Sequence, residues 1–354
     1  MRDGPDGKQG AVAILRTNNN KGTMALVMKN ASHGLSHGHF DKLSYSLYED
    51  GEEVIQDYGL ARYVNVEQKN GGGYLKENTT WAKQTIAHNT IIQDQTSHFK
   101  GVFKESSKHH PEATIFNIDD TKLQVVGARE ENAYPGTVIT RTMMMVQLGD
   151  NEKPLIIDIN QLESDRKHQY DLPTYYKGQL ISTGFTIKPE ESLNPLGDSD
   201  GYQHIWKEAT GIPQGSSNTF TWLSNKKFYS MTSLSNKEDM FIMGRIGAND
   251  PEYNLRSEPM LIHRKEGQKN ALFVQVIESH GNYNPVTEKA LNAYSRVRSL
   301  QSIPVDDGYT AIEMTMRSGK KHMIVLVDNA FAKAEHTLSI LGEKYTWKGI
   351  YTIQ

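Results

Sequence analysis

Residues 43–57 read Leu43-Ser-Tyr-Ser-Leu-Tyr-Glu-Asp-Gly-Glu-Glu-Val-Ile-Gln-Asp57. Apolar and polar residues alternate before Asp50-Gly51 and again after it, which is the pattern of strands with one buried face. The Asp-Gly dipeptide favours the tight turn of a β-hairpin. The stretch therefore predicts two antiparallel strands joined by a short turn.

The same alternation recurs from one end of the chain to the other, in about 18 segments of roughly 5–10 residues. Glycine, asparagine, aspartate, proline or serine separates these segments, and no repeat of fixed period is present. Only Val286–Ala293 has a pattern that suits a helix, and it is short. Many short strands without intervening helices predict an all-β fold, a multi-stranded antiparallel β-sandwich.

The length of 354 residues indicates about two domains. The polar stretch Gly247–Arg256 is the best candidate for a junction between them. We therefore expect a main β-sandwich over residues 1–250, which carries the motifs described below. A C-terminal antiparallel sheet region is expected over residues 251–354, either separate from the first or continuous with it.

The composition excludes several classes of function. The chain has 39 Lys and Arg against 42 Asp and Glu, a formal net charge of −3, so it has no strong basic field for nucleic acid or an anionic membrane. It has no cysteine, which excludes disulfides, thiolate metal sites and thiol nucleophiles. No window approaches about 18 consecutive apolar residues, and the N-terminal residues lack the apolar core of a signal peptide. No membrane span or targeting signal is expected.

Histidine is concentrated in one part of the sequence, with seven of the 13 residues between positions 31 and 110. His37 and His39 are two positions apart, so in an extended chain both side chains face the same way. Asp57 ends the partner strand of the hairpin, and His88 stands at the start of a later strand. Two imidazoles, a carboxylate and one open position for water form a common Zn²⁺ shell. The alternative is a surface loop whose imidazoles bind backbone groups.

Two other assignments fit the motifs less well. A cupin-like metal site requires a glutamate four or five residues after the second histidine, where this sequence has Leu43 and Ser44. The run Gly71–Gly73 is not a phosphate loop, because neither Lys-Ser/Thr nor a helix follows it. It suits close approach of the backbone to a ligand, or a loop that carries Tyr74. A tyrosine beside glycine on a loop more often serves packing than catalysis.

Four motifs together resemble a known family. They are His37–Ser44, Gln56–Gly59, Gly71–Leu75 and Thr85–Thr90, and their order and spacing are specific. They resemble the heparinase II/III-like domain, and most of all that of the alginate and oligoalginate lyases of polysaccharide lyase family 17. The likeness continues from about Ala11 to the end of the chain.

The resemblance implies a β-sandwich domain that normally follows an N-terminal (α/α) toroid, with the active site between the two. Members are exo-acting lyases of the periplasm or the cell exterior that shorten alginate oligomers by β-elimination to unsaturated uronates. The sequence contains no all-helical region that could form the toroid. We therefore expect this chain to be the C-terminal part of such an enzyme, with the toroid as its partner domain.

The resemblance also assigns metal ligands and catalytic residues. His39, Asp57 and His88 match the three ligands of a structural Zn²⁺. Tyr74 matches one of two catalytic tyrosines, as the general acid. The residues expected to be catalytic or to bind substrate are Tyr74, His37, Gly38, Phe40 and Arg62, of which His37 and Arg62 would meet the substrate carboxylate.

The family's other catalytic tyrosine and an Asn-His pair lie on the toroid, so the activity of this chain alone stays open. Three alternatives remain beside an alginate lyase. They are a non-catalytic module that binds acidic glycans, a lyase for a sulfated glycosaminoglycan, and hydrolysis by a metal-activated water.

Overall fold

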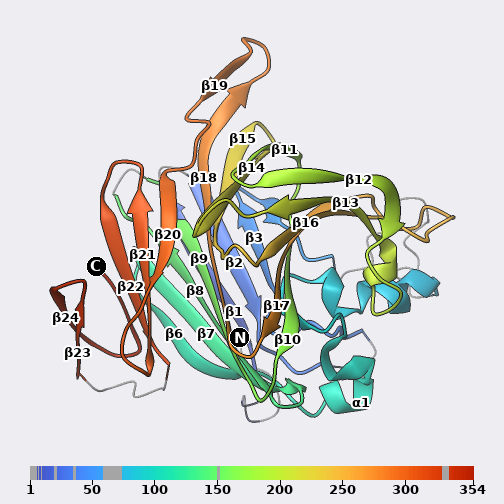
Figure 1. Ribbon diagram of the computed structural model, residues 1–354, viewed down its shortest axis with the longest axis horizontal. Helices are drawn as coiled ribbons and strands as arrows, with labels where there is room; N and C mark the ends of the chain where they lie inside the picture. Colours follow the sequence, from blue (N-terminus) through green and yellow to red (C-terminus); the bar gives the residue numbers. More distant parts are fainter. Residues whose placement is uncertain are drawn as a thin grey trace.

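The computed structural model describes residues 6, 8, 10–19, 22–34, 37–58, 74–149, 152–328 and 335–354. Within these residues 25 strands pair antiparallel, which confirms the expected all-β sandwich (Figure 1). The helical segments are short, and none of those described could span a membrane. They are the π-helix Asn78–Ala82, the 3-10 helices Thr85–Ala87, His98–Gly101 and Tyr202–His204, and α1 (Phe103–Ser106).

Three sheets build the main body. The first contains, in spatial order, β1 (Val12–Asn19), β2 (Gly22–Lys29), β3 (Tyr45–Glu49) and β4 (Glu52–Ile55). The second contains β12 (Thr186–Pro195), β13 (Ile205–Ile212), β16 (Met240–Ile246), β17 (Pro259–Gln268), β10 (His168–Tyr175) and β5 (Ile92–Gln93). The third contains β11 (Gln179–Thr183), β14 (Ser217–Ser224), β15 (Lys227–Leu234), β18 (Ala271–Asn284), β9 (Leu155–Ser164), β8 (Thr137–Val146), β7 (Leu123–Tyr134) and β6 (Glu112–Asp120), with β19 (Lys289–Leu291) paired to β18.

A smaller C-terminal sheet covers the outer face of the third sheet (Figure 1). It contains β20 (Val297–Ile303), β21 (Tyr309–Met316), β22 (Lys321–Val327) and β25 (Tyr351–Ile353), and the hairpin of β23 (Glu335–Ile340) and β24 (Glu343–Lys348) packs beyond it.

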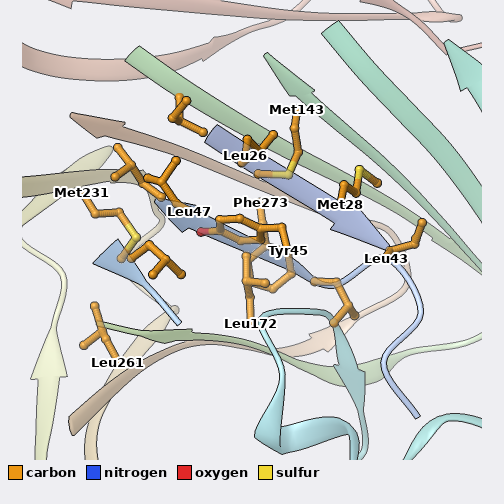
Figure 2. Close-up of a cluster of buried hydrophobic side chains, with 14 of the residues drawn as sticks. Leu26, Met28, Leu43, Tyr45, Leu47, Met143, Leu172, Met231, Leu261 and Phe273 are labelled. Atoms are coloured by element: carbon orange, nitrogen blue, oxygen red, sulfur yellow. The ribbon is translucent and has the colours of Figure 1, made fainter. Parts of the chain in front are cut away.

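The hairpin predicted from residues 43–57 is confirmed as β3 and β4. Glu49 pairs with Glu52 across the turn. Asp50 and Gly51 have φ angles of 52° and 83°, so both central residues of the turn are left-handed. This geometry matches the twist of the flanking strands, which is why Asp-Gly is favoured here. The inward side chains of β3 join the main core, where Figure 2 shows Tyr45 and Leu47 among residues of β2, β8 and β18.

The middle strands of the third sheet are buried on both faces. On β8, Met143 and Met145 join the core shared with the first two sheets, and Met144 joins the core under the C-terminal sheet. Because successive side chains of a strand point to opposite faces, a stretch of strand that lies between two cores carries apolar residues at consecutive positions. The run of three methionines is apolar at consecutive positions because its side chains fill the two cores in turn.

Replacing Met144 with alanine is expected to lower the free energy of unfolding by about 2–5 kcal/mol, because its side chain is fully buried and the cavity would not collapse completely. Chemical denaturation followed by circular dichroism measures the effect. Val286→Ala is the control, since Val286 is 90% exposed and its replacement should change stability by less than about 0.5 kcal/mol. Equal losses from the two variants would contradict a second core at this face.

Residue 250, near the expected boundary, lies between β16 and β17, which are paired neighbours in one sheet. Of the two expected arrangements, this pairing favours a C-terminal region that is continuous with the first. Val286–Ala293 is not a helix but part of the projecting β18–β19 hairpin (Figure 1). Asn284 Oδ1 accepts the backbone N–H groups of Val286 and Thr287 and so forms a turn, and no core contact is available there to stabilise a helix.

Candidate metal centre and active-site segment

Close backbone contacts fix the segment that carries His37 and His39, both to His33 before it and to residues 83–85 after it. At Gly38 an added Cβ would lie 1.7 Å from His33 O, so the close approach requires glycine. Phe40 N donates to Lys83 O at 3.0 Å, and Phe40 O accepts Thr85 Oγ1 at 2.6 Å. These bonds place His39 beside the segment that ends in His88.

Three of the predicted residues meet, together with a fourth that the sequence did not single out. The rings of His39 and His88 are 5.3 Å apart between centroids. His88 Nδ1 lies 2.5 Å from Asp57 Oδ1. Asp41 also belongs to the group, since ligand atoms of His39, Asp41 and His88 all lie within 4.8 Å of one another. Two imidazoles and two carboxylates therefore share one small volume.

The electrostatics of this group follow from burial and one cation. Burial, reinforced by His88, lowers the pKa of His39 to about 3, so its imidazole is neutral. Burial opposes a charge on His88, but Asp57 raises its pKa overall. Burial also opposes a charge on Asp41, yet Lys29, whose Nζ is 2.6 Å from Asp41 Oδ2, lowers its pKa. One oxygen of the Asp41 carboxylate, Oδ2, is thus already paired with a cation.

The donor set fits a zinc ion. His88 Nε2 and Asp41 Oδ1 are buried atoms without a hydrogen-bond partner among the described residues. A buried polar atom without a partner is costly, and a metal ion would satisfy both atoms. Neutral imidazole and carboxylate are ligands that Zn²⁺ accepts in a tetrahedral shell.

Asn89, which follows His88, is a residue that the sequence analysis missed. Its Nδ2 donates to Tyr45 O at 3.0 Å and to Gln56 O at 2.7 Å, and its Oδ1 accepts Tyr175 N at 2.9 Å. One buried amide therefore joins β3, the end of β4 and β10 next to His88. Its only sequence signal is its place beside a candidate ligand.

Lys42 is a second residue of this kind. It is 1% exposed, and its Nζ donates to the backbone oxygens of Ala31, Ser106 and His109 at 3.2, 3.2 and 2.8 Å. Burial lowers its pKa to about 8. The ammonium group holds the His37–Ser44 segment against residues 106–109.

Two of the side chains expected to act on substrate, His37 and Tyr74, are exposed. The exposed fraction of Tyr74 is 65%. The chain after Tyr74 is fixed, because buried Glu77 accepts Asn254 Nδ2 at 3.2 Å and Thr80 Oγ1 contacts His204 Nε2 at 2.8 Å. The phenol of Tyr74 is therefore exposed to solvent, while hydrogen bonds hold the backbone that follows it in place.

The remaining predicted residues divide into two groups. Phe40 is 6% exposed and its ring packs on His33, with centroids 4.8 Å apart, so it fills the base of the segment, and its contact with substrate stays a prediction. Arg62 and Gly71–Gly73 lie outside the described residues.

Two other histidines of the rich region serve packing. His33 Nδ1 is 3.0 Å from Ser106 Oγ, and burial lowers the pKa of His33 to about 4. His98 Nε2 is 3.0 Å from Ile91 O, and burial lowers its pKa to about 3. Both imidazoles are neutral and hydrogen-bonded within the fold.

Two curated relatives align with almost all of this chain. The "Alginate lyase" of Stenotrophomonas maltophilia is 41% identical over 350 residues, which are 99% of this chain and 47% of the relative. The "Exo-oligoalginate lyase" of Saccharophagus degradans is 40% identical over 357 residues, which are 100% of this chain and 48% of the relative. The chain therefore spans about half the length of these relatives.

Solved structures of a heparinase III and of a heparan sulfate lyase share the fold. A heparinase III has a TM-score of 0.58 at 13% identity, covering 90% of this chain and 41% of its own. The heparan sulfate lyase of Pedobacter heparinus has a TM-score of 0.58 at 12% identity, covering 91% of this chain and 42% of its own. At such identities the likeness concerns the fold alone. Residues 1–291 match the family described as "Heparinase II/III-like, C-terminal", and the chain belongs to that family.

Proposed function

We propose that this chain is the C-terminal domain of an exo-acting alginate lyase that cleaves uronate glycosidic bonds by β-elimination. The observation that carries the proposal is the identity of 41% and 40% to relatives named alginate lyase and exo-oligoalginate lyase, along the whole chain. The exposure of His37 and Tyr74 to solvent and the presence of a histidine–carboxylate group support it. By the same resemblance the enzyme acts in the periplasm or outside the cell.

In this reaction a base removes the proton at C5 of a uronate, and the O4 glycosidic oxygen leaves. Neutralising the adjacent carboxylate stabilises the enolate-like intermediate electrostatically. His37 and Arg62 serve that purpose by binding the carboxylate. Tyr74 donates its phenolic proton to O4, a general-acid contribution of typically ~10²–10⁴-fold. The base belongs to a preceding toroid domain, in the half of the relatives that this chain does not span.

A structural Zn²⁺, held by His39, His88 and Asp57, completes the proposal. When bound, the ion supplies positive charge and fixed geometry rather than an activated water. Asp57 either binds the ion directly or orients His88 through Nδ1, in which case Asp41 supplies the third ligand. Each arrangement fastens the segment of His37 to the segment that follows Tyr74.

The proposed activity is tested with a panel of alginate oligomers, heparan sulfate and hyaluronan. The far-ultraviolet absorbance of the unsaturated uronate reports β-elimination. The enzyme is used as this chain alone and as the chain joined to a toroid domain of a family member. We expect product from alginate oligomers with the toroid present and little without it.

Each other result has a definite meaning. Product from heparan sulfate alone would make the chain part of a glycosaminoglycan lyase. Binding of alginate without product in both forms, unaffected by His37→Ala and Tyr74→Phe, would make it a binding module. Rapid turnover by this chain alone would contradict the need for a toroid.

A further inference from the structure

Arg141 is a fully buried cation in the middle of β8. Its Nε and Nη2 donate to the two carboxylate oxygens of Asp158 at 2.8 and 2.7 Å. Its Nη1 donates to two backbone oxygens, Leu43 O at 2.7 Å and Asn89 O at 2.6 Å. The planar guanidinium thus makes a bidentate ion pair on one side and a bridge between two loops on the other.

The two bridged carbonyls belong to the two segments that carry histidine ligands. Leu43 lies four residues after His39, and Asn89 is the residue after His88. Leu43 also has a φ of 62°, a left-handed conformation that is strained for a residue with a side chain. Such a conformation persists where surrounding bonds hold it, and the bond to Arg141 is one of them.

We propose that Arg141 is a positioning residue that sets the separation of His39 and His88 before the metal binds. The inference rests on the zinc site of the proposed function. The two histidine segments are about 50 residues apart in sequence, and a single donor group, Nη1, fixes both backbones. Groups that orient metal ligands in this way contribute strongly to metal affinity.

The protein contains a matched ion pair that lacks this bridge. Arg264 is also buried and donates through Nε and Nη2 to both oxygens of Asp171, each at 2.7 Å. Among the described residues, Arg264 donates to no backbone oxygen of the His37–Ser44 or Thr85–Thr90 segments. Arg264 therefore serves as the control, because its replacement removes a buried bidentate ion pair that stabilises the fold without bridging the two histidine segments.

The experiment compares Arg141→Lys with Arg264→Lys in the 354-residue chain, at a temperature where circular dichroism shows both to be folded. Lysine retains the charge but cannot reach Asp158 and both carbonyls in a fork. Zinc affinity is measured by competition with a chromophoric chelator. We expect Arg141→Lys to weaken zinc binding about 10–100-fold and Arg264→Lys to leave it within about twofold. Equal affinities in the two variants would overturn the proposal.

A second variant and a metal-free measurement keep the proposal testable if Arg141→Lys does not fold. Arg141→Met/Asp158→Leu removes both charges, a replacement that buried ion pairs often tolerate. Without metal, hydrogen exchange should rise at residues 37–44 and 85–90 but not at residues 205–212. Unchanged exchange would overturn the positioning role. Failure of the wild-type chain to bind zinc would instead overturn the proposed metal site, and hydrogen exchange alone would then decide the role of Arg141.

Discussion

Replacing Tyr74 with phenylalanine is expected to lower kcat on alginate oligomers by about 10²–10⁴-fold in the form of the enzyme that carries the toroid. The substitution removes one hydroxyl group, and with it the proton that O4 would receive. Because the ring is 65% exposed, loss of the hydroxyl group should not change the stability of the fold. Initial rates, with the thermal unfolding midpoint measured in parallel, check the prediction.

The control is Tyr294→Phe, since Tyr294 is 78% exposed and precedes the C-terminal sheet. It should retain wild-type rates. Unimpaired turnover in Tyr74→Phe would remove this residue from the acid role. A rise in KM with unchanged kcat would assign the hydroxyl to substrate binding instead, because a group that acts only in the transition state changes kcat.

Zinc should stabilise this chain strongly, and removal of a histidine ligand should abolish that effect. A ligand that binds only the folded state at 100 times its Kd raises the free energy of unfolding by about 2.7 kcal/mol. We expect a higher unfolding midpoint on adding Zn²⁺, reversal by a chelator, and no response in His39→Ala. His110→Ala is the control, because this half-buried histidine lies outside the group.

The two carboxylates can be separated by the same measurement. Asp57→Asn is expected to reduce zinc affinity more than Asp41→Asn, since Lys29 already neutralises Asp41 while Asp57 contacts His88. The opposite order would make Asp41 the metal ligand and Asp57 the group that orients His88. A zinc response in His39→Ala equal to that of the wild type would exclude the proposed centre altogether.

The fold was predictable where the local pattern matched the environment of the strand. The 43–57 hairpin has one buried face and an Asp-Gly turn. The alternation of apolar and polar residues indicates the first feature, and the Asp-Gly dipeptide indicates the second. Strand β10 was not predicted because it contains Pro173 and a buried Asp171, whose charge is compensated by Arg264 and by the hydroxyl of Tyr202. Strand β12 escaped because it is largely exposed and has no apolar alternation. These strands depend on partners distant in the chain.

The site divides along the same line. The types of His39, Asp57 and His88 and the motif order predict them as metal ligands, which stays a prediction, and the structure brings the three side chains together. Arg141, Asn89 and Lys42 were not, because each acts on backbone oxygens that have no side-chain signature. A residue that supports a loop by donating to the carbonyl oxygens of that loop can be identified only from a structure that shows the residue and the loop together.

The projecting β18–β19 hairpin has a practical consequence in a chain without cysteine. A Val286→Cys substitution would introduce a unique thiol at a position that is 90% exposed and outside the buried clusters. A maleimide dye or a derivatised surface would then attach at one defined point. Metal uptake and unfolding could be followed on tethered single molecules, without chemical modification of the histidine-rich segment.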